Sequence, residues 1–247
     1  MRVRSIRLAF NSVAALLAIT GTCLAGTAPL IAIDVGHSRE NPGAMSARGV
    51  PEFDFNTALA RVVRQTLFLR GTRVIDIAGD GDMQYLSPRT ADARARGATF
   101  FLSIHHDSGQ PQYLEPWEWE GVARNYIDRF SGFSLFVSRS NPKLAASLRC
   151  ASRIGAAMRR AGLQPTPHHA EKIPGESKQW ADRQNGVYYF DNLVVLKSAG
   201  MPAVLLEAGV ILNRAEELQV QAPEMRERIA AAVHRGLSDC GMTGNNR

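Results

Sequence analysis

The sequence contains few cysteines and no paired-cysteine motif. Only three of the 247 residues are cysteine, and no two of them are separated by two positions. Zinc sites built from cysteine depend on closely spaced Cys-x-x-Cys pairs, so this class of metal site is excluded. The chain also lacks runs of basic residues interleaved with aromatic ones, which are typical of nucleic-acid binding. We therefore expect neither a cysteine-bound metal nor a nucleic-acid partner.

Long apolar runs are also lacking, except near the N-terminus. Residues 8–19 are mostly apolar, follow three arginines and precede small residues that end at Ala25. This pattern is typical of a secretory signal peptide, and the apolar stretch is short for a bilayer span. We expect residues 1–25 to be a signal peptide and residues 26–247 to form an exported protein of the periplasm or cell envelope, with no membrane span after cleavage. The alternatives are a retained anchor or, in a poor sequence context, a lipoprotein site at Cys23.

Removal of this segment changes the charge and the cysteine count. The formal net charge of +6 falls to +3 once the three arginines of the signal segment are removed. A mildly positive protein is suited to an anionic cell wall. Cys150 and Cys240 remain. An even pair in an exported protein permits a disulfide, and two unpaired cysteines are the alternative.

Short apolar runs alternate with amphipathic segments along the rest of the chain. Such alternation predicts a single layered α/β domain with helices on both faces of a sheet. Two long polar stretches, residues 110–131 and 165–192, interrupt the pattern and are predicted to be functional or mobile loops. The predicted strands are residues 30–35, 72–77, 99–104, 133–137 and 202–206, and the predicted helices are residues 54–69, 87–97, 142–161 and 223–237.

Each predicted loop carries side chains that can contact a substrate. Residues 110–131 contain Trp117 and Trp119 among several glutamates. Aromatic side chains of this kind stack on sugars or fill a groove, so the segment is interpreted as a substrate surface, as a lid, or as a surface excursion packed on the body. The second loop contains His168 and His169, which are candidates for substrate contact.

Three predicted strands end in a side chain that can bind a metal or carry a proton. The first strand is followed by His37, the third by His105 and the last by Glu207. Because ligands bind beyond the carboxyl ends of strands in open α/β sheets, we expect these side chains to meet at one edge. Each alone has a simpler explanation as a loop histidine, a buried histidine or a glutamate paired with arginine. Their equivalent positions favour a functional site.

Two histidines and two glutamates suit a hydrolytic zinc site. Catalytic zinc takes three protein ligands from histidine and carboxylate and keeps one position for water. A second carboxylate, not bound to the metal, then accepts a proton. Glu52 and Glu207 are both placed for these roles, and their spacing alone leaves open which of them binds the metal.

The motifs around these residues are similar to those of a known enzyme family. They occur in that family's order and cover roughly residues 29–240. The chain thereby resembles the zinc-dependent N-acetylmuramoyl-L-alanine amidases of amidase type 3. The motifs are IDVGH (33–37), Glu52 at the start of a helix, FLSIHHD (101–107), LVVLKSAGMP (193–202), PAVLLEAG (202–209) and ILNRAEE (211–217).

The resemblance implies the roles of four residues. His37, Glu52 and His105 correspond to the zinc ligands, and Glu207 corresponds to the catalytic glutamate. It also implies a twisted, mostly parallel sheet of about six strands. The implied reaction is hydrolysis of the amide between the lactyl group of N-acetylmuramic acid and L-alanine of the stem peptide. Peptidoglycan is then the substrate, Zn2+ the cofactor, and a protein activator an expected partner.

Asp34 and His106 are further candidates close to these motifs. Asp34 is a candidate for orienting a zinc-bound histidine, as carboxylates often do, with a structural hydrogen bond as the alternative. His106 is a candidate contact to a ligand or to substrate, with a solvated histidine as the alternative. Val35 and Ser38 stand where the family usually has proline and a second glycine, a difference that affects loop stiffness and not ligand chemistry.

Two other functions use the same residues. A zinc peptidase that cuts within stem peptides would need the same metal and the same base, so only its products would distinguish it. A non-catalytic wall-binding protein of the same fold is the other alternative, and a complete set of ligands and base disfavours it.

Overall fold

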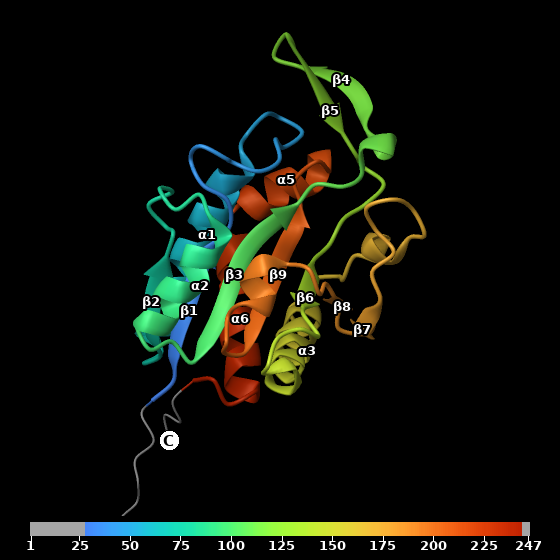
Figure 1. Cartoon of the computed structure of the whole chain (residues 1–247). Helices are drawn as coiled ribbons and strands as arrows, with labels where there is room; N and C mark the ends of the chain where they lie inside the picture. Colours follow the sequence, from blue (N-terminus) through green and yellow to red (C-terminus); the bar gives the residue numbers. More distant parts are fainter. Residues whose placement is uncertain (1–27, 244–247) are drawn as a thin grey trace, which may run out of the picture.

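Seven strands form one sheet in the computed structural model, which describes residues 28–243 (Figure 1). The strand order is β2-β1-β3-β9-β6-β8-β7. Neighbours from β2 to β9 are parallel, β6 is antiparallel to β9 and parallel to β8, and β7 is antiparallel to β8. The strands are β1 (Leu30–Val35), β2 (Arg73–Ile77), β3 (Phe100–Asp107), β6 (Ser134–Val137), β7 (Trp180–Asp182), β8 (Val187–Tyr189) and β9 (Ala203–Val210).

Helices cover both faces of this sheet, so the α/β fold and the mostly parallel sheet are confirmed, with seven strands in place of about six. Side chains of α1, α3 and α6 share one buried cluster with one face of the sheet, and side chains of α2 and α4 share another with the opposite face. The helices are α1 (Glu52–Leu69), α2 (Leu86–Ala95), α3 (Leu144–Arg160), α4 (Val194–Lys197), α5 (Arg214–Gln221) and α6 (Pro223–Asp239).

The alternation of side chains along β3 decides which of them reach the site. Phe100, Leu102 and Ile104 belong to the cluster under α1, α3 and α6, while Phe101 belongs to the cluster under α2 and α4. Successive side chains of a strand point to opposite faces. The side chains at positions 105 and 107 therefore share the α2 and α4 face, at the carboxyl end of the strand.

Both predicted loops contain strands that the sequence analysis did not identify. Residues 110–131 form an antiparallel hairpin of β4 (Glu115–Trp119) and β5 (Val122–Tyr126), which projects beyond the carboxyl ends of the parallel strands (Figure 1). Residues 165–192 contain β7, β8 and a short 3-10 helix, His168–Ala170. Strands of three residues are too short to show the alternation from which strands are predicted.

The hairpin is attached to the body through its tryptophans. Trp117 and Trp119 stack with ring centroids 5.5 Å apart, and the Arg48 guanidinium lies 4.8 Å from the centroid of Trp119. The indole N–H of Trp117 donates to the carbonyl oxygen of Ala47 at 3.0 Å. These contacts join the hairpin to the loop that precedes α1.

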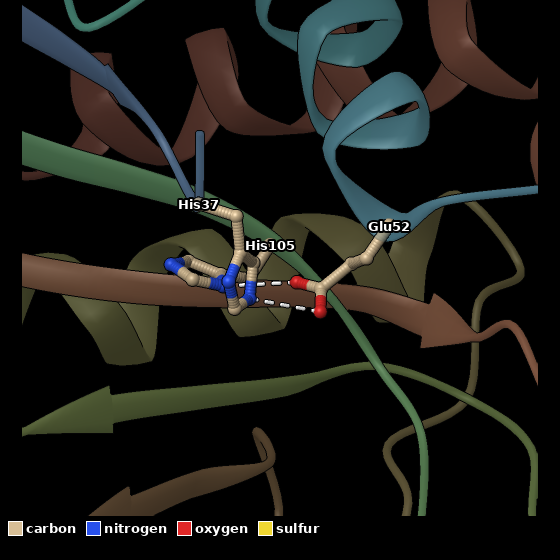
Figure 2. Close-up of side chains that lie close together, drawn as sticks. All are labelled: His37, Glu52 and His105. Atoms are coloured by element: carbon tan, nitrogen blue, oxygen red, sulfur yellow. Dashed lines mark hydrogen bonds and ion pairs between the residues drawn. The ribbon is translucent and has the colours of Figure 1, made fainter. Parts of the chain in front are cut away.

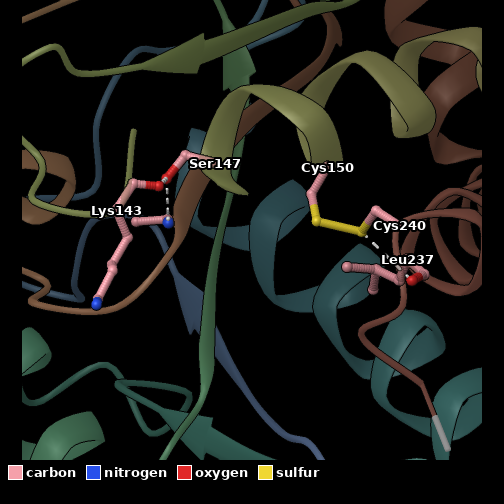
Figure 3. The surroundings of a disulfide bond; sticks show 6 residues. Lys143, Ser147, Cys150, Leu237 and Cys240 are labelled. Atoms are coloured by element: carbon pink, nitrogen blue, oxygen red, sulfur yellow. Dashed lines mark hydrogen bonds between the residues drawn. A yellow bond between two sulfur atoms is a disulfide. The ribbon is translucent and has the colours of Figure 1, made fainter. Parts of the chain in front are cut away.

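A disulfide joins α3 to the end of α6. Cys150 lies within α3, and Cys240 is the C-terminal cap of α6, with Cα atoms 5.2 Å apart (Figure 3). Both side chains are buried, and they belong to the core cluster under α1, α3 and α6. The bond closes a separation of 90 residues in the sequence, far from the carboxyl end of β3.

The predicted signal peptide, residues 1–25, and Cys23 within it lie outside the described residues. Within residues 28–243, every helix is too short or too polar to cross a membrane.

Candidate functional site

His37, Glu52 and His105 come together at the carboxyl end of the parallel strands (Figure 2). His37 Nε2 lies 2.9 Å from Glu52 Oε2, and His105 Nδ1 lies 3.0 Å from Glu52 Oε1. The two imidazole rings are edge to face, with centroids 4.9 Å apart. Each residue offers one ligand atom, and these atoms lie within 4.8 Å of one another. The three residues predicted as ligands therefore lie together in one group.

His37 follows β1 in a left-handed backbone conformation, with φ at 69°. This region is uncommon for residues other than glycine, so the surrounding structure must hold it. The Arg89 guanidinium does so, because its Nη2 donates to the carbonyl oxygen of His37 and its Nη1 to that of Val35. The turn thereby directs the imidazole of His37 toward Glu52.

Glu52 is buried at the first position of α1 and is held by several donors. Its Oε1 accepts from the Asn56 side-chain amide at 3.1 Å and from the backbone N–H of His106 at 3.3 Å. Burial raises the pKa of Glu52, but hydrogen bonds and charge from His105 and His37 outweigh this and hold the pKa well below its ordinary value. The carboxylate is therefore ionised and ready to bind a cation.

Two glycines leave room for this group. A Cβ at Gly36 would lie 2.4 Å from the ring of His105, and a Cβ at Gly43 would lie 2.5 Å from Glu52 Oε2. Gly43 also has φ at +79°, which favours glycine. Any larger residue at either position would displace a ligand side chain.

Glu207 lies beside His105, because the two residues are directly paired across β3 and β9. Its Oε2 is buried and has no hydrogen-bond partner among the described residues. Burial, followed by the negative charges of Asp107 and Glu52, raises the pKa of Glu207 well above its ordinary value. A carboxylate of raised pKa, unbound and next to a ligand set, has the chemistry of a general base.

The ligand group opens into a pocket on the face covered by α2 and α4. The side chains of His37 and His105 are 31% and 18% exposed, whereas that of Glu52 is 6% exposed. A substrate can therefore reach the group from the histidine side. The pocket is lined by Asp34, His37, Ser38, Asn41, Gln84, Leu86, Arg89, His105, Leu193 and Val195.

Asp34 lies under the site and contacts an arginine. Its Oδ1 accepts from Arg89 Nη1 at 2.9 Å, and its Oδ2 accepts from the Ser103 hydroxyl at 2.6 Å. Since Arg89 also donates a hydrogen bond to the carbonyl oxygen of His37, Asp34 acts on the histidine through this arginine. Arg89 could not be predicted from the sequence, because a single arginine in a helix gives no sign that it will be fully buried.

His106 points to the opposite face from His105. It is 2% exposed, so the interpretation as a solvated histidine was wrong. Its Nδ1 lies 2.8 Å from Asn56 Oδ1, and Asn56 in turn donates to Glu52. Burial lowers the pKa of His106 to about 4, so its ring is neutral and donates to Asn56. The side chain of His106 therefore acts on Glu52 through Asn56, while its backbone N–H contacts Glu52 directly.

His168 and His169 are buried beside Asp107, with 1% and 5% exposure. Both ring Nε2 atoms face the Asp107 carboxylate, and the three residues form a second group of metal-competent atoms. Asp107 could not be predicted from the sequence, because its contacts are with histidines in a loop about 60 residues away, and such contacts leave no local sequence pattern.

Comparison with known proteins gives one family over most of the chain. The family model for N-acetylmuramoyl-L-alanine amidase matches residues 31–239. The amidase AmiC of Neisseria meningitidis is 23% identical over 233 residues, covering 86% of this chain and 52% of that protein. The chain thus spans about half the length of that curated relative.

Solved amidase structures share the fold. The Ami1 amidase of Mycobacterium smegmatis has a TM-score of 0.67 at 21% identity and covers 86% of this chain and 96% of that one. The CwlD amidase of Clostridioides difficile, solved in complex with the GerS lipoprotein, has a TM-score of 0.65 at 20% identity and covers 86% and 98%.

Proposed function

Since this chain belongs to the N-acetylmuramoyl-L-alanine amidase family, we propose that it is a zinc-dependent hydrolase of bacterial peptidoglycan. The bond cut is the amide between the lactyl group of N-acetylmuramic acid and L-alanine of the stem peptide. The observation that carries this proposal is the position of Glu207, an unpartnered buried carboxylate paired with His105 next to a complete ligand set.

The residues present fit a zinc ion. Two imidazoles and one carboxylate are a common ligand set of catalytic zinc, and ligand atoms around a tetrahedral ion with bonds of about 2.0 Å lie roughly 3.3 Å apart. The distances of 2.9 and 3.0 Å from Glu52 to the two histidines need only a small adjustment to meet this spacing. His37, Glu52 and His105 would hold the ion, and the chemistry supplied by bound zinc is Lewis-acid polarisation of the scissile carbonyl.

Glu207 has the properties of the proton carrier in this reaction. Its raised pKa favours acceptance of a proton from the attacking water. Donation of that proton to the departing amine of L-alanine would then complete the cleavage. Arg89 and Asp34 keep the His37 turn in place and touch no reacting atom. The contacts of Glu52 with both histidines support its role as ligand and that of Glu207 as base.

Export and partners belong to the same proposal. A peptidoglycan hydrolase must reach the cell wall, and residues 1–25 have the pattern of a signal peptide. The disulfide between Cys150 and Cys240 fits an oxidising compartment. The complex of CwlD with a lipoprotein supports a protein activator for this chain as well.

Mass analysis of fragments released from purified sacculi tests the function. We expect stem peptides with a free L-alanine amine and glycan strands with intact lactyl groups. Peptides cut internally while still attached to muramic acid would identify a peptidase. Binding to sacculi with no released fragment, in zinc-loaded protein, would identify a non-catalytic wall-binding protein.

A further inference from the structure

A second group of ligand atoms lies at the same edge of the sheet. Asp107 is the last residue of β3, and His168 and His169 open the short 3-10 helix after α3. His168 Nε2 lies 3.1 Å and His169 Nε2 lies 2.7 Å from Asp107 Oδ2. None of these three residues has a role in the proposed amidase reaction.

The three atoms are close together but are not hydrogen-bonded to one another. Asp107 Oδ2, His168 Nε2 and His169 Nε2 are all buried, and all three lack a partner of hydrogen-bond geometry among the described residues. The ligand atoms of this group lie within 4.8 Å of one another, close enough to share one cation. Ligands around a zinc ion are arranged in this way, roughly 3.3 Å apart.

The far side of each imidazole is held by a separate partner. His168 Nδ1 lies 2.7 Å from the Thr166 hydroxyl, and His169 Nδ1 lies 3.0 Å from Glu176 Oε2. An ionised carboxylate only accepts hydrogen bonds, so the Nδ1 of His169 carries the proton. The neutral ring then presents the lone pair of its Nε2 toward Asp107. Carboxylate partners of this kind orient metal-bound histidines in proteins.

Glu176 is itself fixed in place. Lys178 Nζ donates to its Oε2 at 2.7 Å, and the Gln110 amide donates to its Oε1 at 2.7 Å. The charge balance also favours a cation, because the carboxylates of Asp107 and Glu176 lie at the two ring nitrogens of His169, 2.7 Å and 3.0 Å away. The negative charges of these two carboxylates would stabilise a metal ion bound at Nε2.

We propose that Asp107, His168 and His169 form a second divalent-metal site, distinct from the site of His37, Glu52 and His105. Two imidazole nitrogens and one carboxylate oxygen select zinc or a similar transition metal over calcium and magnesium, which prefer oxygen ligands. The two sites are connected through β3, where Asp107 follows His105 by two positions on the same face. The negative charges of Asp107 and Glu52 both act on Glu207.

Zinc content, measured after dialysis at a fixed free zinc concentration, tests this site. We expect two zinc ions per wild-type protein and one in the folded His37→Ala/His105→Ala variant, which leaves the second group untouched. Addition of Asp107→Asn to that variant should weaken the remaining zinc affinity at least tenfold. His234→Ala, on α6, is the matched control and should leave two ions in place. X-ray absorption of the His37→Ala/His105→Ala protein should show two imidazole ligands.

The outcomes separate this site from the proposed amidase site. A wild-type protein with a single zinc that is lost in folded His37→Ala/His105→Ala protein would overturn the second site and leave the amidase proposal intact. A single zinc that persists in that variant and is lost with Asp107→Asn would overturn the zinc site of His37, Glu52 and His105 and leave the second site intact. If the only zinc is lost in His37→Ala/His105→Ala protein, Asp107 and a protonated His169 form an ion pair and bind no metal.

Discussion

Glu207 combines burial, an unpartnered oxygen and direct pairing with His105. We predict that Glu207→Gln lowers kcat on sacculi by about 100-fold or more, because an amide cannot accept the proton that the reaction transfers. Zinc bound by His37, Glu52 and His105 should be retained, which elemental analysis would check. Glu224→Gln, at an exposed position of α6, is the control. Loss of zinc in the Glu207 variant would mean that this residue is a ligand.

His106 makes stability depend on pH. Its pKa is lowered from 6.5 to about 4 in the folded protein, mainly by burial. Below pH 6.5 the unfolded chain binds a proton that the folded protein does not, so stability is full above pH 6.5 and falls as the pH approaches 4. The loss amounts to about 3 kcal/mol at most.

We predict that His106→Gln flattens the fall in unfolding free energy between pH 7 and pH 5, measured by urea titration of zinc-free protein. His234→Gln, at a partly exposed histidine, should change this slope less. An unchanged slope in His106→Gln would show that folding does not lower the pKa of His106.

Two of the proposed ligands could be predicted from the sequence because each follows a recognisable strand, and the family resemblance indicated the third. His37 and His105 follow apolar strands whose carboxyl ends meet at one edge of the sheet, whereas Glu52 lies at the start of α1, two residues before the predicted helix. Arg89 could not be predicted, since its role depends on the carbonyl oxygens of a strained turn. Asp107 could not be predicted either, because its partners lie in a loop whose path depends on tertiary packing.

The disulfide between α3 and α6 should stabilise the fold without affecting chemistry. Cys150 and Cys240 lie in the core far from the site. We predict no free thiol in denatured, unreduced protein that begins at residue 26. The Cys150→Ala/Cys240→Ala variant should lose about 2–4 kcal/mol of unfolding free energy, with kcat unchanged. Two titratable thiols would exclude the bond.

The hairpin of β4 and β5 is attached to the body and borders a groove near the carboxyl end of β3. Its lining includes residues 44–46 from the loop before α1, residues 108–109 after β3, and residues 123–125 of the hairpin. A hairpin bound through Trp117 to Ala47 and Arg48 is a fixed wall, which favours the interpretation as a substrate surface over that of a lid.

We predict that replacement of residues 115–126 by a short Gly/Ser linker raises KM for sacculi severalfold, while kcat and zinc content stay unchanged. The reason is that the linker removes one wall of the groove and no ligand. Faster hydrolysis after the replacement would identify a lid. Unchanged KM and kcat would show that Trp117 and Trp119 pack on the body and do not contact the substrate.

The long elements could be predicted because their apolar periodicity extends over many residues. β1, α1, β3, α3 and α6 were each expected within a few residues of their bounds. The hairpin could not be predicted, since β4 and β5 alternate between exposed and half-buried positions and lack an apolar face. β8 depends on pairing with β6, which lies about 50 residues away, and β7 depends in turn on pairing with β8.

At the scale of the molecule, a metal ion would connect separate parts of the chain. The ligands His37, Glu52 and His105 come from the end of β1, the start of α1 and β3. We predict that chelation of zinc lowers Tm, because an ion that binds only the folded protein stabilises it by RT ln(1 + [Zn]/Kd), about 4 kcal/mol at a thousandfold excess over Kd. Calorimetry with and without chelator measures the difference. Equal Tm values for zinc-loaded and chelated wild type would contradict a site in the folded protein.

The order in which the strands are made differs from their order in the sheet. β9 lies between β3 and β6, although it is the last of the strands along the chain, and α6 packs against both α1 and α3. The core on that face cannot close until residue 239 has left the ribosome. Pairing over such long separations is slow, so the growing chain stays open through most of its synthesis. The proposed export would gain from this delay, because a polypeptide passes through a secretion channel before it folds, and the delay is a property of the topology.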